Sequence, residues 1–173
     1  MRLLVRHANA GHKRHWSGPD AERPLSIRGW AQAEGLLDTL ADLRVERLLT
    51  SPSRRCRQTL LPLAAALDLD LESVDDLGTD GDLDRLVDLL AAGDSDGAVL
   101  CTHGEVLGEL FARLRARGHP RREPTAREKG STWLLEGAAA GRGPAPHAWW
   151  PSESAPTERP ERGGVRSAHP GPQ

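Results

Sequence analysis

Four apolar runs of strand length alternate with helical patterns over residues 1–136, and this alternation restricts the possible folds more than any other feature. The runs are RLLV at 2–5, ERLLT at 46–50, GAVLCT at 97–102 and STWLLE at 131–136. Their apolarity is continuous rather than alternating, which is typical of strands buried on both faces. The pattern predicts an α/β fold, a three-layer α/β/α sandwich around a mainly parallel sheet.

Helical spacing fills the segments between these strands. The first helix is predicted to follow Ser26, a residue type that caps helix N-termini. Its apolar stripe consists of Trp30, Ala33, Leu36, Leu37 and Leu40, and Gly29, Gln32 and Glu34 fall outside the stripe. Further helices are predicted at about 53–67, over DLDRLVDLLAAG ending at Gly93, and over EVLGELFARLRARG ending at Gly118.

Composition changes after about residue 136, where Gly, Pro and Ala become frequent and periodicity is lost. We therefore predict a domain at 1–136 and a flexible Pro/Gly-rich tail at 137–173, with the HAWW segment as the candidate for an ordered stretch. No apolar run reaches the ~20 residues of a membrane helix, and the N-terminus lacks a signal peptide's apolar stretch. A cytoplasmic protein that does not bind membranes is expected.

Charge and cysteine content exclude several classes of function. The net charge of −2 argues against a surface that coats nucleic acid polymers, so an anion site would be local. Cys56 and Cys101 are far apart and lack the spacing of zinc ligands, so neither a disulfide framework nor a metal site is predicted. No cofactor is implied by the sequence.

Three of the predicted strands are followed by cationic or hydrogen-bonding residues. Arg6 and His7 follow the first strand, SPSRR at 51–55 follows the second, and His103 follows the third. Because ligands bind at the carboxyl edge of open α/β sheets, we expect these residues to share one site. Arginine donors match phosphate oxygens, and a neutral histidine can attack phosphorus to form a phosphohistidine without a metal ion.

The motifs LLVRHANAGHK, RPLSIRGWAQAEGL, LLTSPSRRCRQTLLPLA, VLCTHGEVL and KGSTW together resemble the histidine phosphatase superfamily, which is phosphoglycerate-mutase-like. The resemblance covers about residues 1–135. It points to two small bacterial branches: the SixA-type phosphohistidine phosphatases, and the phosphatase half of mycobacterial-type fusions with a Nudix domain. It implies the phosphoglycerate-mutase-like form of the α/β/α sandwich.

The resemblance also assigns roles to four residues. His7 is implied to be the nucleophile, with Arg6 contacting the phosphate beside it. Within the Ser-Pro-x-x-Arg-small motif, Arg55 rather than Arg54 corresponds to the pocket arginine. His103 is implied to hydrogen-bond the phosphate and to brace the transition state. Ala8 departs from the family's usual glycine after the histidine.

The general acid is the second departure from the family pattern. Relatives place a carboxylate shortly after the third strand of the family fold, and the corresponding segment of this chain, at 74–84, reads VDDLGTDGDLD. Asp80 is the candidate, one step beyond the aligned position. A phosphohistidine nitrogen or a nucleoside phosphate leaves more readily than a sugar alkoxide and needs less proton donation, so the departure argues against sugar monophosphates.

Residues near the predicted mouth of the site carry two interpretations each. His12 and Lys13 are either substrate contacts or part of a solvated basic loop. Arg23 either closes that loop over the anion or forms a structural salt bridge. Lys129 and Ser131 either reach the phosphate or belong to a turn led by Gly130.

The sequence thus predicts a metal-independent phosphatase that acts on a phosphate ester or phosphoramidate through a phosphohistidine on His7. The substrate is either a phosphohistidine protein or a small nucleotide-like phosphate. The alternative is a phosphate-binding regulatory module with the same pocket and low turnover. By analogy with the fusions, a separate Nudix hydrolase is a candidate functional partner.

Overall fold

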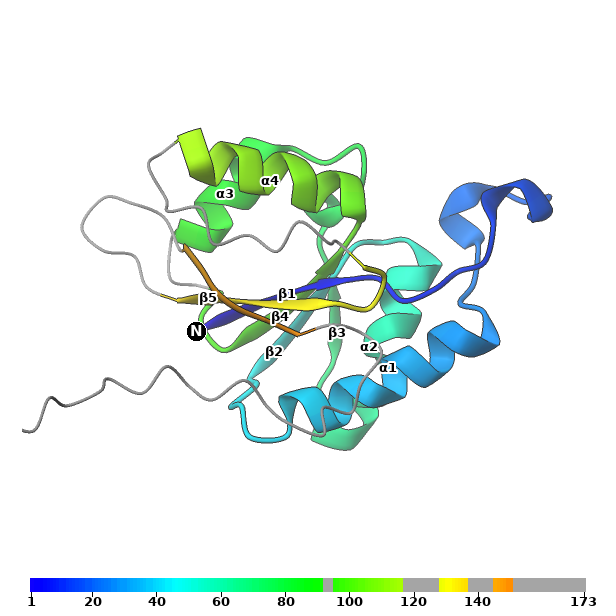
Figure 1. Ribbon diagram of the computed structural model, residues 1–173, viewed down its shortest axis with the longest axis horizontal. Helices are drawn as coiled ribbons and strands as arrows, with labels where there is room; N and C mark the ends of the chain where they lie inside the picture. The colour runs from blue at the N-terminus through cyan, green and yellow to red at the C-terminus, as the bar shows by residue number, and fades with distance from the viewer. Residues whose placement is uncertain (92–94, 117–127, 137–144, 151–173) are drawn as a thin grey trace, which may run out of the picture.

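A six-stranded sheet with the order β3-β2-β4-β1-β5-β6 forms the centre of the molecule (Figure 1). The computed structural model describes residues 1–91, 95–116, 128–136 and 145–150. The strands are β1 (Arg2–Arg6), β2 (Arg47–Thr50), β3 (Leu71–Ser73), β4 (Ala98–Thr102), β5 (Thr132–Glu136) and β6 (Ala145–Trp150). The first four are parallel to one another, β5 runs antiparallel to β1, and β6 runs antiparallel to β5. The predicted mainly parallel sheet is confirmed.

Strands β3 and β6 were not predicted from the sequence. β6 lies in the range predicted as a tail and pairs with β5, so the whole HAWW segment at 147–150 is part of the sheet. Residues 137–144 and 151–173 lie outside the described part of the chain, and the domain boundary at 136 stays a prediction.

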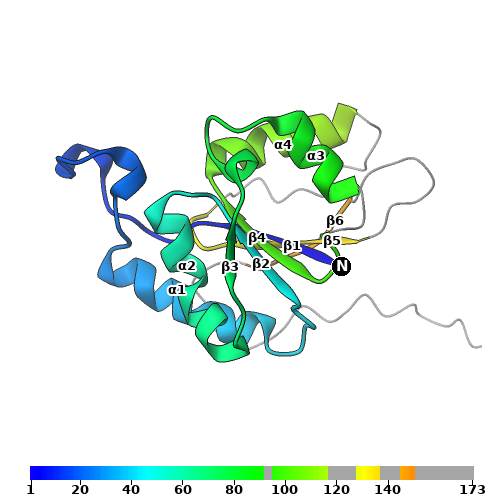
Figure 2. The same cartoon turned by 180° about the vertical axis from the view of Figure 1, so that it is seen from behind.

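Four α-helices cover the two faces of the sheet, α1 and α2 on one and α3 and α4 on the other (Figures 1 and 2). They are α1 (Ile27–Leu40), α2 (Arg54–Leu67), α3 (Leu83–Ala91) and α4 (Gly104–Ala116), with short 3₁₀ turns η1 (Lys13–His15), η2 (Asp20–Glu22) and η3 (Asp75–Leu77). The three-layer α/β/α sandwich is therefore confirmed. The predicted helix stops at Gly93 and Gly118 lie outside the described residues.

The continuous apolarity of the central strands is explained by two separate cores. In β1, Leu3 and Val5 pack in the cluster that includes side chains of α1 and α2, whereas Leu4 packs in the cluster that includes α3 and α4. All three side chains are fully buried. Within the described residues, no helix combines the length and apolarity required to cross a bilayer.

Helix α1 begins where predicted but buries two residues that were placed outside its apolar stripe. The Ser26 hydroxyl accepts a hydrogen bond from the Gly29 amide at 3.1 Å. Gly29 and Gln32 are buried because they face the loop after β1, and the Gln32 Oε1 accepts from the Asn9 amide at 2.8 Å. An apolar stripe alone does not reveal a helix face that packs on backbone.

Replacing Gly29 with alanine is expected to destabilise the protein, because a Cβ there would lie 2.0 Å from the Asn9 carbonyl oxygen. Overpacking against backbone costs about 1–3 kcal/mol. Gly35 is the matched control in the same helix, since a Cβ there meets nothing within 4 Å. Gly35→Ala should leave stability unchanged or raise it by up to about 1 kcal/mol. Equal urea midpoints for the two variants would contradict the expected clash.

Candidate active site

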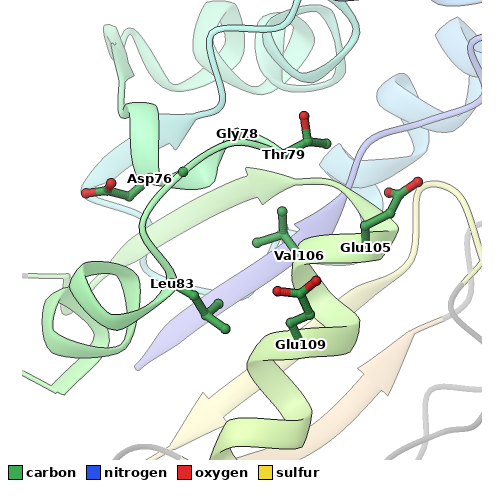
Figure 3. Close-up of a pocket in the computed structure, with 8 residues that line it drawn as sticks. Asp76, Gly78, Thr79, Leu83, Glu105, Val106 and Glu109 are labelled. Carbon is green, nitrogen blue, oxygen red and sulfur yellow. The ribbon is translucent and has the colours of Figure 1, made fainter.

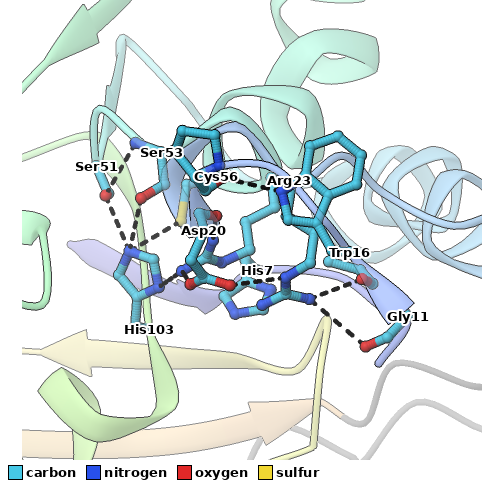
Figure 4. A network of polar contacts seen from close by, with 12 residues as sticks. His7, Gly11, Trp16, Asp20, Arg23, Ser51, Ser53, Cys56 and His103 are labelled. Atoms are coloured by element: carbon cyan, nitrogen blue, oxygen red, sulfur yellow. Dashed lines mark hydrogen bonds and ion pairs between the residues drawn. The ribbon is translucent and has the colours of Figure 1, made fainter. Parts of the chain in front are cut away.

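The carboxyl ends of β1, β2 and β4 meet at one edge of the sheet and bring together the residues predicted to share a site (Figure 4). His7 follows β1, and its amide donates to the Thr102 carbonyl of β4 at 2.9 Å. His103 follows β4, and the His7 and His103 ring centroids are 5.3 Å apart. Arg55 enters from the first turn of α2 and contacts His103.

The His7 ring is held with one nitrogen committed to the backbone. Its Nδ1 lies 2.8 Å from the Ala8 carbonyl oxygen, which can only accept, so Nδ1 carries the proton and Nε2 carries the lone pair. The backbone here is fixed through Thr59, whose hydroxyl accepts from the Ala8 amide at 3.0 Å and donates to the Arg55 carbonyl at 2.7 Å. His7 therefore has the tautomer that a nitrogen nucleophile needs.

The surroundings of His7 favour its neutral form. Burial is the largest of the effects that together lower the pKa of His7 from its usual 6.5 to about 3; the nearby His103, Arg55 and Arg6 also lower it, whereas the hydrogen bond to Ala8 opposes the shift. The Nε2 lone pair is therefore available throughout the neutral range.

The buried neutral His7 should make stability depend on pH. Below pH 6.5 the unfolded chain binds a proton on this residue that the folded chain excludes until the pH approaches about 3. The free energy of unfolding should fall as pH decreases through this window, by up to about 1.4 kcal/mol per pH unit from this proton. Urea unfolding of the wild type and His7→Gln across the window tests this. A difference between the two proteins that does not change with pH would contradict it.

His103 is fully enclosed by hydrogen-bonding groups. Arg55 Nη2 donates to His103 Nδ1 at 3.2 Å, which places the His103 proton on Nε2. Nε2 lies 2.9 Å from the Ser51 hydroxyl, with Ser53 Oγ at 3.5 Å and Cys56 Sγ at 3.6 Å. Both His103 nitrogens thus contact protein groups in this structure, and its role toward phosphate stays a prediction.

The structure separates the two candidate arginines of α2. Arg55 is buried, with its guanidinium at His103 and Asp20, whereas Arg54 is exposed. The placement agrees with the selection of Arg55. Cys56 is fully buried beside His103, as expected of a packing residue.

Arg6 lies against the start of α4. A Cβ added to Gly104 would lie 2.7 Å from the Arg6 Cζ and 2.8 Å from its Nε, so the guanidinium rests on the Cα of this glycine. The contact places the Arg6 charge beside both His7 and the N-terminus of an α-helix, two features that favour an anion.

The predicted outer residues lie at different depths. His12 and Lys13 are exposed. Arg23 forms a salt bridge, which was the second of its two interpretations: its Nε donates to Asp20 Oδ1 at 2.9 Å. Lys129 is half-buried, and burial lowers its pKa, as do Arg6 and Arg23.

Ser131 has the geometry expected if the segment before β5 forms a turn, which was one of the two interpretations of this segment. The Ser131 hydroxyl is buried and donates to the Glu128 carbonyl at 2.5 Å, next to Gly130 with a φ of 83°. A role for Ser131 or Lys129 in substrate binding stays a prediction.

Asp80 lies in the exposed turn between η3 and α3. Among the described residues, no hydrogen bond or ion pair involves its carboxylate. The turn borders a pocket against α4 whose lining residues are Asp76, Gly78, Thr79, Gly81, Leu83, Glu105, Val106 and Glu109 (Figure 3). Asp80 as general acid stays a prediction.

A family model agrees with the geometry of this edge. The model of the histidine phosphatase superfamily (branch 1) matches residues 3–78, the segment that contains His7 and Arg55. The chain belongs to the histidine phosphatase superfamily. The predicted resemblance is confirmed.

Similarity to this histidine phosphatase is found both in a relative by sequence and in solved structures. The 8-oxo-(d)GTP phosphatase of Mycolicibacterium smegmatis is 37% identical over 138 residues, which span 77% of this chain and 43% of the relative. The chain thus matches less than half the length of that relative.

Among solved structures, the protein histidine phosphatase SixA with tungstate has a TM-score of 0.72 and 22% identity, covering 87% of this chain and 96% of that one. A mycobacterial glucosyl-3-phosphoglycerate phosphatase with VO3 has a TM-score of 0.62 and 16% identity, covering 86% and 95%. These structures share the fold.

Three residues of the site were not identified from the sequence: Asp20, Thr59 and Gly104. Asp20 lies in a segment, GPDAERP, that has only loop character, although its spacing of three from Arg23 is a weak signal.

Within the described residues, no cluster of three or more His, Cys, Asp or Glu side chains is arranged to hold a metal ion.

Proposed function

We propose that this histidine phosphatase removes the terminal phosphoryl group of a nucleotide-like phosphate through a phosphohistidine on His7, without a metal ion. The observation that carries the proposal is the His7 tautomer. Nδ1 is committed to the Ala8 carbonyl, so Nε2 holds a lone pair in a ring kept neutral by burial. A neutral imidazole of this kind is the nucleophile that phosphoryl transfer to histidine requires.

The chemistry proceeds in two steps. In the first, the His7 Nε2 forms a bond to phosphorus while the bond to the leaving group breaks, and the leaving group keeps that electron pair. In the second, water attacks the phosphohistidine, inorganic phosphate leaves and the Nε2 lone pair is restored. Arg6 and Arg55 compensate the negative charge on the transferring oxygens in both steps.

Two observations favour a nucleotide-like phosphate as the substrate. Positive charge extends outward from Arg6 to Lys129, whose lowered pKa reflects its burial and its cationic neighbours, and this suits a chain of more than one phosphate. Among the described residues the Asp80 carboxylate makes no hydrogen bond or ion pair with a residue of the site, so a leaving group that needs little protonation, such as a nucleoside phosphate, fits better than an alkoxide. The likeness to the 8-oxo-(d)GTP phosphatase agrees with this class, and a functional link to a Nudix hydrolase stays a prediction.

The decisive experiment is phosphate release by the metal-free protein in the presence of EDTA. Nucleoside mono-, di- and triphosphates, a phosphohistidine protein and sugar phosphates are compared at equal concentration. Selective release from nucleoside di- or triphosphates supports the proposal. Selective release from phosphohistidine protein would overturn the substrate class but keep the mechanism, and vanadate binding without any turnover would favour the phosphate-binding regulatory module.

A further inference from the structure

One carboxylate, Asp20, lies among the cations of the site, where its negative charge would repel a phosphate group (Figure 4). The Asp20 Oδ2 is 3.2 Å from Arg55 Nη2, and its backbone carbonyl accepts from Arg55 Nη1 at 2.6 Å. The same residue therefore contacts both terminal nitrogens of one buried guanidinium. Asp20 belongs to the 3₁₀ turn η2, 35 residues before Arg55 in the chain.

Asp20 is itself held in place by the loop that follows the nucleophile. Arg23 Nε donates to Asp20 Oδ1 at 2.9 Å, and Arg23 Nη1 donates to the Ala10 carbonyl at 2.7 Å. Partial burial opposes ionisation of Asp20, but the hydrogen bond from Arg23 and the charge of Arg55 outweigh it and lower the pKa of the carboxyl. The carboxylate is thus a fixed anion rather than a proton donor.

Arg55 has few alternatives to the orientation that these contacts impose. Its side chain is 6% exposed, Nη1 is directed to Asp20, and Nη2 is shared between Asp20 and His103 Nδ1. A guanidinium is planar, so two contacts from one residue fix the plane in which its remaining donors point. Without Asp20, the contact with His103 would be the one remaining contact, among the described residues, that holds the Arg55 guanidinium.

We propose that Asp20 is a positioning residue that fixes the Arg55 guanidinium against His103 for phosphoryl transfer. The inference rests on the proposed function, because it assigns Arg55 to the transferring phosphoryl group. Asp20 does not contact the reacting atoms; it acts through Arg55.

A double-mutant cycle tests the proposal. Asp20→Asn should lower kcat by about 10- to 100-fold, because an Arg55 guanidinium that is no longer held in place loses one charge-assisted hydrogen bond to the transferring group. Asp20→Glu should recover part of that loss. In an Arg55→Lys background, Asp20→Asn should change kcat by no more than about twofold, because the group through which it acts is already altered. The matched control is Glu22→Gln, an exposed carboxylate of the same turn, which should retain wild-type kcat.

Thermal unfolding of each variant identifies any that fail to fold, and ¹⁵N NMR of the arginine side chains provides a second readout in the folded Asp20→Asn protein. Faster rotation of the Arg55 guanidinium in this variant supports the proposal. Equal losses from Asp20→Asn in the wild-type and Arg55→Lys backgrounds, or unchanged Arg55 rotation, would overturn it. The same cycle measured by vanadate affinity does not require turnover, so failure of the proposed function is distinguishable from failure of this inference.

Discussion

The His7→Ala variant is expected to lose phosphate release by about 10⁴-fold or more while remaining folded, because the Nε2 lone pair is the group that bonds to phosphorus. Alanine at this position also removes a buried ring that is only 6% exposed, so the folded state is checked separately by circular dichroism. The measurement is incorporation of ³²P from a labelled substrate during rapid quenching. The wild type should acquire an acid-labile, base-stable label, and His7→Ala should not.

The exposed residue His15 supplies the control for that experiment, since it lies in the 3₁₀ turn η1 of the same segment and has no predicted role in the site. His15→Ala should label as the wild type does. If His7→Ala still acquires the label or turns over, the nucleophile is another residue and the tautomer argument fails.

The second large effect is expected from Gly104→Ala, which should lower kcat by about 10- to 100-fold, the value of one charge-assisted contact to phosphate. The added Cβ would overlap the Arg6 guanidinium, whose Cζ lies 2.7 Å from that position, so the side chain must move. Stability should remain equal or increase by up to about 1 kcal/mol, because Gly104 begins α4 and alanine favours helix over glycine. Steady-state kinetics and thermal unfolding measure the two effects.

The test is specific because Gly104→Ala is expected to lower kcat while stability stays equal or increases. Gly35→Ala, which adds the same methyl group to an open position in α1, should leave kcat unchanged. Full activity in Gly104→Ala would show that the Arg6 guanidinium does not act from the position it has in the structure.

The strands of the inner sheet could be predicted because burial on both faces leaves a direct record in the sequence. Residues 98–102 of β4 are all buried, and the corresponding run in the sequence is apolar up to its final threonine. β3 leaves no such record, since it has three residues and two of them are exposed. β6 contains Pro146 within an Ala- and Pro-rich stretch, and its conformation depends on pairing with β5 rather than on local preference.

The residues of the site also divide into those that the sequence could indicate and those that it could not. That His7, His103 and the segment 51–55 share one edge could be predicted because each follows a strand, so the topology of the fold determines its position. The choice of Arg55 over Arg54 came from the resemblance to the family motif. Asp20 and Gly104 act through tertiary contacts, and nothing in the flanking residues indicates which side chain will be met. The polar face of α1 at Gln32 was missed for a related reason, because its partner is the backbone of Asn9.

The Thr59 hydroxyl, which joins the backbone after His7 to the backbone of Arg55, bears on how this enzyme could evolve. This link and the strand hydrogen bonds set the separation of nucleophile and arginine without using residues 12–19, which are exposed apart from Trp16. Because His12 and Lys13 of that segment are candidate substrate contacts, substitutions at its exposed positions are expected to alter substrate preference while leaving the reactive geometry intact. Libraries that vary residues 12–19 alone are therefore a direct way to change substrate preference at constant chemistry.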